Sequence, residues 1–349
     1  MLTEQQLKEI KEHLENAQNP IFLFDNDPDG LCSFLLLQRY IGRGRGVSLR
    51  GHSSVTASFF KRVEEFNADY IFVLDRAVLS EEFIKLAKEA NILIVAIDHH
   101  DIPHQNIKFY YNTFETSGKS EPTSYLCYRA TGKKEDLWLA MVGSIADCFV
   151  PEFLDEFRKK YPELVGNYKG AFDIRYNTDL GKIIHVLAFG LFDKTSNVVS
   201  MIKFLMKVTN PQDILQETKQ TKSFLDTYEI INKKVEDIVS KAEENIDKKK
   251  NLLYFTYGGQ MSISQPASDK LNYRNPKLSI VLGFIKGDSA KFSLRGSIDI
   301  RTAMLNSIKD IEGATGGGHK NSCGAQMIAS SVPEFKEKLL KEIEKMNKI

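Results

Sequence analysis

The stretch Asn91-Ile-Leu-Ile-Val-Ala-Ile-Asp98-His99-His100-Asp101 decides the fold class, because polar residues follow directly on an apolar run. Such a run is typical of a strand that is buried on both faces of a parallel sheet. Open α/β sheets bind their ligands at the carboxyl ends of these strands. The stretch therefore predicts a strand that delivers a carboxylate, Asp98, and two imidazoles, His99 and His100, to a binding edge.

Two further apolar runs end in acids. Residues 21–24 precede Asp25, Asp27 and Asp29, and residues 70–74 precede Asp75. Taken alone, each acid is best explained as the cap of a following helix. Three acids within five residues would repel one another, however, and a divalent cation is the usual compensation. Carboxylates mixed with imidazoles suit Mn²⁺, Mg²⁺ or Zn²⁺, and two such ions about 3.5–4 Å apart would form a phosphoryl-transfer centre.

The whole composition limits the class of protein. A chain of 349 residues is longer than one hydrophobic core usually allows, so we expect two domains. The formal net charge of +1 excludes a globally basic nucleic-acid binder and leaves only local basic contacts. The four cysteines have no CxxC spacing, and no apolar run reaches membrane-spanning length. We therefore expect reduced thiols and a cytoplasmic protein without a membrane partner.

Periodicity predicts the order of the elements. Strands and helices alternate from residue 20 to about residue 110, as in a parallel α/β sheet, and helices dominate from 123 to 208. In that extension an apolar helix over 137–146 leads to Asp147, an acid that needs either a helix-capping role or a buried partner. Residues 209–250 are predicted to form a long helical connector. We accordingly assign residues 1–208 to a catalytic α/β domain and residues 251–349 to a smaller α+β domain.

The second domain contains one unusual segment, Gly316-Gly317-Gly318-His319, followed by Lys320. Consecutive glycines let backbone amides approach an anion, and the histidine adds a donor. A flexible loop is the ordinary explanation of three glycines. Phosphate capture becomes about as plausible because Arg295 lies on a nearby predicted strand.

Together, these motifs resemble, in order and rough spacing, those of the DHH phosphoesterases that carry a DHH-associated C-terminal domain. The motifs are Asp25-x-Asp27-x-Asp29-Gly30, Asp75, Asp98-His99-His100, Gly143-Ser-Ile-Ala-Asp147 and Gly316-Gly-Gly-His319. The chain is similar to the branch that holds RecJ-type single-strand exonucleases, nanoRNases and cyclic-dinucleotide phosphodiesterases.

The resemblance implies a role for each residue. Asp27 and Asp29 would each hold one of two divalent ions, preferentially Mn²⁺ with Mg²⁺ as the alternative. Asp75 would bridge the ions, and His99 and Asp147 would complete the second one. Asp25, where many relatives have histidine, would be a further ligand or an orienting acid.

Four more assignments follow from the same resemblance. Asp98 would orient its neighbours, and His100 would face the phosphate or the leaving oxygen. Arg295 and the segment Gly316, Gly317, Gly318 and His319 would hold the nucleotide. After Asp75 the family often has a small residue and then glycine, whereas this chain has Arg76 and Ala77. We expect Arg76 to pair with a surface acid.

The function implied is a two-metal phosphodiesterase that hydrolyses single-stranded DNA or RNA from an end, or degrades short oligonucleotides. Two alternatives remain open: a cyclic-dinucleotide phosphodiesterase, and a catalytically weak or silent scaffold subunit of a replication complex. The expected partners are the nucleic acid, replication or repair proteins and a second copy of the chain.

Overall fold

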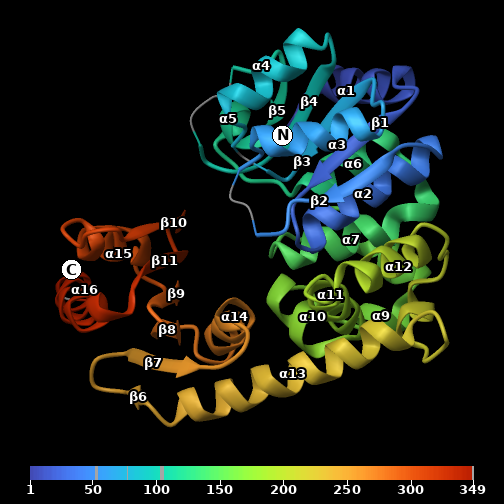
Figure 1. Ribbon diagram of the computed structural model, residues 1–349. Coiled ribbons are helices and arrows are strands. Elements are labelled where there is room, and N and C mark those ends of the chain that lie inside the picture. The colour runs from blue at the N-terminus through green and yellow to red at the C-terminus, as the bar shows by residue number, and fades with distance from the viewer. Residues whose placement is uncertain (52–53, 77, 103–105, 348–349) are drawn as a thin grey trace. The chain divides into compact units, whose positions relative to one another are not determined.

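The computed structural model describes residues 1–51, 54–76, 78–102 and 106–347, which form two compact units, Met1–Tyr228 and Glu229–Ile349 (Figure 1). The strands of the first unit are β1 (Pro20–Phe24), β2 (Arg45–Ser48), β3 (Tyr70–Leu74), β4 (Leu93–Asp98) and β5 (Phe109–Asn112). Its helices are α1 (Glu4–Asn16), α2 (Pro28–Ile41), α3 (Phe60–Glu65), α4 (Glu81–Glu89), α5 (Thr113–Ser117), α6 (Thr123–Thr131), α7 (Leu137–Ala146), α8 (Leu154–Lys160), α9 (Pro162–Val165), α10 (Ala171–Asn177), α11 (Asp179–Gly190) and α12 (Thr195–Leu205). The 3₁₀ turns of this unit are η1 (Ala57–Phe59), η2 (Lys134–Asp136) and η3 (Pro211–Leu215).

The five strands of the first unit form one sheet in the order β2-β1-β3-β4-β5, and every neighbouring pair is parallel. This confirms the predicted parallel α/β sheet. Parallel register brings the carboxyl ends of β1, β3 and β4 to one edge, with β3 between the other two. The three acid-bearing segments identified in the sequence therefore start at neighbouring points.

Side chains of the central strands alternate between two hydrophobic cores, because successive residues of a strand point to opposite faces. One core contains Phe22, Phe24, Phe72, Leu74, Val95 and Ile97, packed with residues of α1, α2, α6 and α7. The other contains Ile21, Leu23, Ile71, Val73, Ile94 and Ala96, packed with residues of α3 and α4. Burial on both faces explains why these strands are continuous apolar runs rather than alternating ones.

The second unit has its own mixed sheet and its own core. Its strands are β6 (Ile246–Asp247), β7 (Leu252–Gly258), β8 (Ser279–Lys286), β9 (Ser289–Arg295), β10 (Thr315–His319) and β11 (Ser322–Ile328), in the order β10-β11-β9-β8-β7-β6. The other elements are α14 (Ser264–Arg274), α15 (Ile300–Ile308), η4 (Ala329–Ser331) and α16 (Val332–Met346). The helix α13 (Lys222–Glu243) runs from the first unit into the second.

The glycine segment is a strand and not a loop. Residues Thr315 to His319 form β10, an edge strand that pairs antiparallel with β11 and is exposed at every position. The segment gains its regular structure from backbone pairing alone, because glycine contributes no side chain to the packing. The loop alternative considered from the sequence is therefore wrong.

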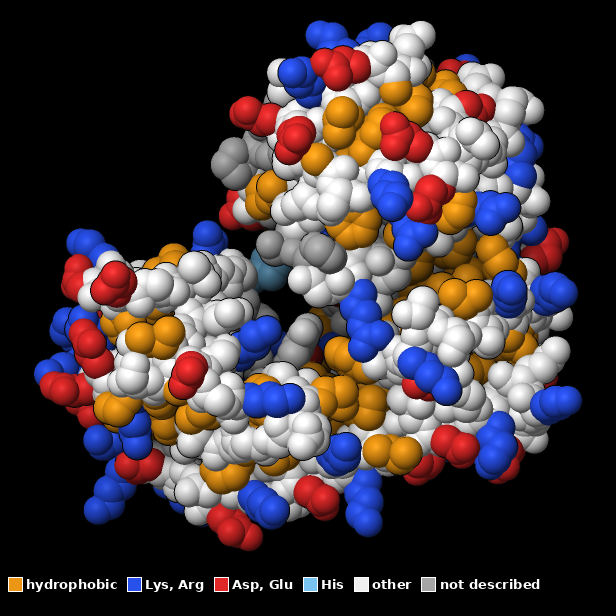
Figure 2. Space-filling model, in the orientation of Figure 1, with side chains coloured by type: hydrophobic (Ala, Val, Ile, Leu, Met, Phe, Trp, Pro, Cys, Tyr) orange, Lys and Arg blue, Asp and Glu red, His pale blue; other side chains and the backbone are white. Residues whose placement is uncertain are grey.

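Two features of the structure agree with the sequence: the mixed charges on its surface and the limited length of its apolar helices. On the face drawn in Figure 2, the basic and acidic side chains of the described residues are interspersed. In the part of the chain that the structure describes, none of the helices combines the length and the apolar character needed to cross a bilayer.

Candidate metal centre

The first group of acids lies where β1 leads into α2. Asp27 is the N-cap of α2, and its carboxylate accepts a hydrogen bond from the Gly30 backbone N–H at 2.9 Å. The capping role considered from the sequence is thus present. It uses one carboxylate oxygen and leaves the other for a second ligand, so capping and metal binding are compatible at Asp27.

Asp29, in the first turn of α2, is completely buried. Its carboxylate accepts the backbone N–H groups of Thr123 and Ser124, at 2.8 and 3.0 Å, and the Ser124 hydroxyl. These donors fix the orientation of the carboxylate. Burial and the charge of Asp27 nevertheless raise the pKa of Asp29 to about 7, because neutral donors compensate only part of the cost of a buried charge.

The close packing of α7 against this carboxylate requires a glycine. A Cβ atom added at Gly143 would lie 2.2 Å from the Ser124 hydroxyl and 3.1 Å from an Asp29 carboxylate oxygen. Any side chain at this position would therefore displace the group that orients Asp29. This accounts for the glycine that stands four residues before Asp147 in the sequence.

Asp75 follows β3 and lies 2% exposed between the other strand ends. Its backbone adopts a left-handed conformation with φ 59°, which a non-glycine residue adopts only at a cost of about 1–3 kcal/mol. Burial, together with the charges of Asp27 and Asp29, raises the pKa of Asp75 well above its usual range. A buried carboxylate that lies this close to other acids is a candidate ligand for a divalent cation, which would compensate its charge.

His99 connects Asp75 to Asp147, the acid that follows α7. Its Nε2 lies 3.1 Å from an Asp75 oxygen and 3.3 Å from an Asp147 oxygen. On the other side of the ring, Nδ1 lies 2.6 Å from the Ser120 hydroxyl. If Nδ1 carries the proton that bonds Ser120, Nε2 presents its lone pair to the acids, which is the tautomer that a metal requires.

His100 is held by Asp98, which is fully buried at the end of β4. The His100 Nδ1 lies 2.8 Å from an Asp98 oxygen. Burial opposes a charge on the ring, but the hydrogen bond and the charge of Asp98 outweigh it and raise the pKa of His100 to about 9. The two adjacent histidines therefore have different partners: His99 contacts Asp75 and Asp147, whereas His100 contacts Asp98.

The predicted ligands of the first unit come together in three overlapping groups. Within each group the ligand atoms all lie within 4.8 Å of one another: Asp25, Asp27 and Asp75; Asp29, His99 and Asp147; and Asp75, His99 and His100. Asp75 and His99 each belong to two of the groups. The donor set of carboxylate oxygens and imidazole nitrogens fits Mn²⁺, Mg²⁺ or Zn²⁺. The raised pKa values of Asp25, Asp29 and Asp75 show that their negative charges are only partly compensated by the protein.

Arg76 does not pair with a surface acid as expected. It forms an ion pair with Asp25, one of the predicted ligands, and the two side chains are only 16% and 22% exposed. Burial and Asp27 raise the pKa of Asp25 to about 6 even though Arg76 acts in the opposite direction. Ala77, the other departure noted in the sequence, lies outside the described residues.

The predicted substrate residues lie in the second unit. Arg295 ends β9, and the backbone register pairs it with Ser322 on β11, which in turn pairs with His319 on β10. Arg295 is 7% exposed, and its Nε donates to Asp269 at 2.7 Å. His319 and the three glycines are exposed. The sheet therefore places Arg295 and His319 in one row, two strands apart.

Several residues of the centre were not predicted, because nothing in a single sequence distinguishes them. Ser120, which precedes α6, contacts His99, and Thr123 and Ser124, the first residues of α6, contact Asp29. Asn112 on β5 donates to the His100 backbone carbonyl at 3.0 Å. Serine, threonine and asparagine are common in loops and at helix starts, so only the three-dimensional contacts reveal that these residues orient ligands.

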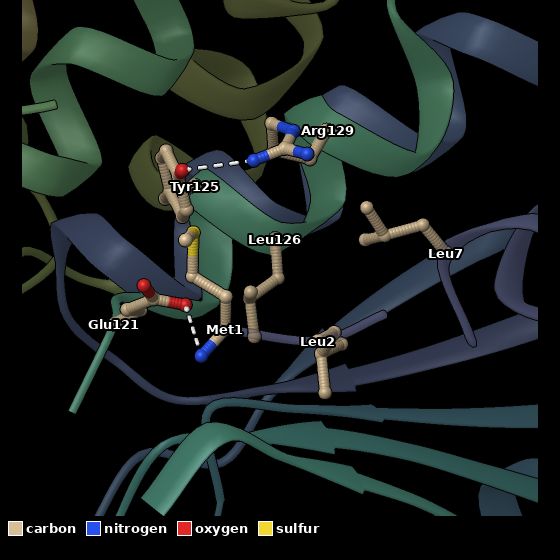
Figure 3. A pocket seen from close by; sticks show the side chains of 7 residues that line it. All are labelled: Met1, Leu2, Leu7, Glu121, Tyr125, Leu126 and Arg129. Carbon is tan, nitrogen blue, oxygen red and sulfur yellow. Dashed lines mark hydrogen bonds and ion pairs between the residues drawn. The ribbon is translucent and has the colours of Figure 1, made fainter. Parts of the chain in front are cut away.

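A small pocket elsewhere in the first unit carries no comparable chemistry. Figure 3 shows that Met1, Leu2, Leu7 and Leu126 line it together with Glu121, Tyr125 and Arg129. The N-terminal ammonium lies 3.7 Å from Glu121, and Arg129 donates to the Tyr125 hydroxyl at 3.1 Å. The first contact joins the N-terminus to the residues before α6, and the second lies within α6. Neither has a predicted catalytic role.

Comparison with known families matches two segments of the chain. Residues 21–149 match the DHH family N-terminal domain, and residues 249–346 match the DHHA1 domain. No curated protein sequence matches the chain. The two matched segments contain the acid and imidazole groups and the glycine strand, respectively.

Solved structures share the fold at low sequence identity. RecJ from Thermus thermophilus in complex with Mn²⁺ matches with a TM-score of 0.72 and 15% identity over 99% of this chain and 55% of RecJ, so this chain spans about half the length of that relative. The pGpG-specific phosphodiesterase PggH from Vibrio cholerae matches with a TM-score of 0.53 and 12% identity over 94% of this chain and all of PggH. CDC45 from Entamoeba histolytica matches with a TM-score of 0.54 and 10% identity over 97% of this chain and 99% of CDC45.

Proposed function

This chain belongs to the DHH family and carries a DHHA1 domain, and from that premise we propose that it is a metal-dependent phosphodiesterase. Its proposed substrates are single-stranded nucleic acid, hydrolysed from an end, or short oligonucleotides. The observation that carries the proposal is the set of three ligand groups at one sheet edge. The group of Asp75, His99 and His100 shares Asp75 with one of the other two groups and His99 with the other. Groups linked in this way suit two neighbouring ions.

The proposed assignment gives each residue a defined task. Asp25 and Asp27 would serve one ion, Asp29, His99 and Asp147 the other, and Asp75 both. When bound, a pair of divalent ions lowers the pKa of the attacking water and offsets the charge that develops on the phosphoryl group. Mn²⁺ is the proposed ion, which the Mn²⁺ complex of the RecJ relative supports.

His100 is the proposed proton donor to the leaving oxygen. The hydrogen bond between its Nδ1 and Asp98 orients the ring and favours the protonated form. A group that is protonated near neutral pH can donate a hydrogen bond as the phosphorus–oxygen bond breaks. Asp98 is therefore a positioning residue in this proposal, and His100 a catalytic one.

Arg295, Gly316, Gly317, Gly318 and His319 are the proposed nucleotide-binding residues. The glycines are exposed on β10, an edge strand, and their lack of side chains lets an anion approach the backbone closely. Arg295 lies in the same register row but is paired with Asp269. A phosphate bound there would have to share the guanidinium with that acid.

One experiment tests the proposed activity and its alternatives together. The purified full chain, loaded with Mn²⁺, is incubated with 5′-labelled and 3′-labelled DNA and RNA of graded length, with the linear dinucleotide pGpG and with cyclic dinucleotides. We expect metal-dependent hydrolysis of the linear substrates, and the label that is released first gives the polarity. Preferential cleavage of the cyclic substrates would instead favour the cyclic-dinucleotide alternative.

The remaining alternative is the scaffold of a replication complex. It predicts that all substrates stay intact even when metal analysis finds bound Mn²⁺. The six acids and two histidines at the centre argue for catalysis, because a scaffold has no need to bury repelling carboxylates together.

A further inference from the structure

Arg76 occupies an unusual position in the centre. It directly follows Asp75 in the chain, and its guanidinium contacts Asp25 rather than solvent. The Nε atom of Arg76 is buried and has no hydrogen-bond partner. The Arg76 guanidinium is therefore held beside Asp25 by this ion pair, and its Nε–H group adds no hydrogen bond.

The contact places a protein cation in one of the ligand groups. Asp25, Asp27 and Asp75 lie close enough to hold an ion, but Asp25 already has a guanidinium as its partner. An ion that enters this group must share Asp25 with Arg76 or displace it. Separating two charges that are less than a quarter exposed costs free energy, because neither regains full hydration at once.

The second group differs at Asp29, whose hydrogen bonds come from the neutral donors Thr123 and Ser124. Its other acid, Asp147, contacts His99, which is another predicted ligand. The positive charges of His100 and Arg175 also act on Asp147. An ion that enters this group keeps the donors of Asp29 in place. It needs the His99 tautomer in which Nδ1 donates to the Ser120 hydroxyl.

We propose that Arg76 competes with the divalent ion for Asp25, so that the two metal positions fill in sequence. The group of Asp29, His99 and Asp147 fills first, and the group of Asp25, Asp27 and Asp75 fills second and more weakly. The inference rests on the proposed function in one respect, namely that the centre binds divalent ions. Its own content is the inequality of the two positions and the residue that causes it.

The test is a Mn²⁺ titration of the chelator-treated full chain, with free Mn²⁺ followed by electron paramagnetic resonance. Wild type should show a tighter and a weaker site. Arg76→Gln should tighten the weaker site by about tenfold or more and leave the tighter one nearly unchanged, because the competing charge is gone. Arg76→Lys, which keeps the charge but loses the planar fork, should fall between the two.

Two controls make the result specific. Arg62→Gln removes the same charge from an exposed pair with Glu65 on α3 and should change neither site. Thermal unfolding of each metal-free variant verifies that the fold is intact. An Arg76→Gln protein that is folded but shows an unchanged or weaker second site would overturn the proposal, as would equal tightening of both sites.

The outcome also separates this inference from the proposed function. If neither wild type nor Arg76→Gln binds Mn²⁺, the proposed function fails and the competition fails with it. If two ions bind to wild type with equal affinity and Arg76→Gln does not alter either, only the competition is wrong. If Arg76→Gln binds more Mn²⁺ ions than wild type, the competition is supported, because Arg76 then keeps the second ion out of the wild-type centre.

Discussion

The acid edge of the parallel sheet and the glycine edge of the mixed sheet are built by opposite means. At the first, the ends of β1, β3 and β4 bring carboxylates and imidazoles into contact, and several of them are fully buried. At the second, β10 presents three glycines and one histidine, all exposed. The first edge is rich in buried charged groups, and the second is rich in exposed glycines.

This difference determines what each edge reveals without a ligand. Buried charges need partners, so the contacts of Asp29 or His99 already indicate their role. An exposed glycine strand has no such requirement, and its structure is complete through its pairing with β11. The metal centre can therefore be inferred from internal contacts, whereas the nucleotide-binding role of β10 must be tested with substrate.

The largest effect is expected from the residue shared by two ligand groups. Asp75→Ala should lower hydrolysis of oligonucleotides and of bis-p-nitrophenyl phosphate by about a thousandfold or more, because both ions lose a ligand. Metal analysis of the loaded variant should find fewer than two ions. Asp155→Ala, at an 85% exposed acid of the same unit, is the matched control. Full turnover by Asp75→Ala would exclude the two-ion centre.

The two histidines should separate binding from rate. His99→Ala should weaken Mn²⁺ affinity by about ten- to hundredfold, because it removes a ligand together with its orienting bond to Ser120. His100→Ala should retain both ions and lower kcat by about a hundredfold, the effect of losing a general acid. Mn²⁺ titration and single-turnover kinetics distinguish the two. Equal metal loss in both variants would contradict the division of labour.

A smaller effect, selective for nucleotides, is expected at the second edge. His319→Ala and Arg295→Ala should lower kcat/KM on oligonucleotides by about ten- to hundredfold, the cost of a charged hydrogen bond to phosphate. Hydrolysis of bis-p-nitrophenyl phosphate should change far less, because that ester needs only the metal centre. Lys291→Ala, an exposed basic residue on β9, is the control.

For Arg295 the stability must be measured as well, because the variant leaves Asp269 without this partner. Parallel losses on both substrates would argue against a nucleotide-binding role, as would no loss on either.

The smallest effects concern the glycines themselves. A Cβ added at Gly318 would lie 2.6 Å from the Ser322 backbone oxygen, and its φ of 130° disfavours other residues, whereas a Cβ at Gly317 meets open space. Gly318→Ala should therefore lower the free energy of unfolding by about 1–3 kcal/mol, and Gly317→Ala should change it by less than about 0.5 kcal/mol. Denaturant unfolding checks both values. Equal destabilisation by the two substitutions would contradict the difference in packing between Gly317 and Gly318 on β10.

The sequence was sufficient to predict the parallel sheet and the convergence of its acids, because apolar runs that end in Asp imply strand ends on one rim. The contact between His99 and Asp147 could be expected only from the family resemblance, since they lie 48 positions apart in the chain. Three features could not be predicted: the pairing of Arg76 with Asp25, the orientation of Asp29 by Ser124, and the strand at residues 315–319. The first two depend on contacts between residues that are far apart in the chain. The strand pairs locally with β11, but glycine has too little intrinsic preference for a strand to indicate one.

The open edge of β10 has a consequence for the solubility of the protein. An exposed edge strand offers unpaired backbone groups to any other extended chain and is a common starting point for aggregation. Three adjacent glycines make a poor template, because they supply no apolar side chains to bury and lose more backbone entropy on pairing than other residues. Lys320, directly after the strand, adds a charge that opposes stacking. The composition that we propose for ligand binding at this edge thus also protects the sheet from growing into a neighbouring molecule.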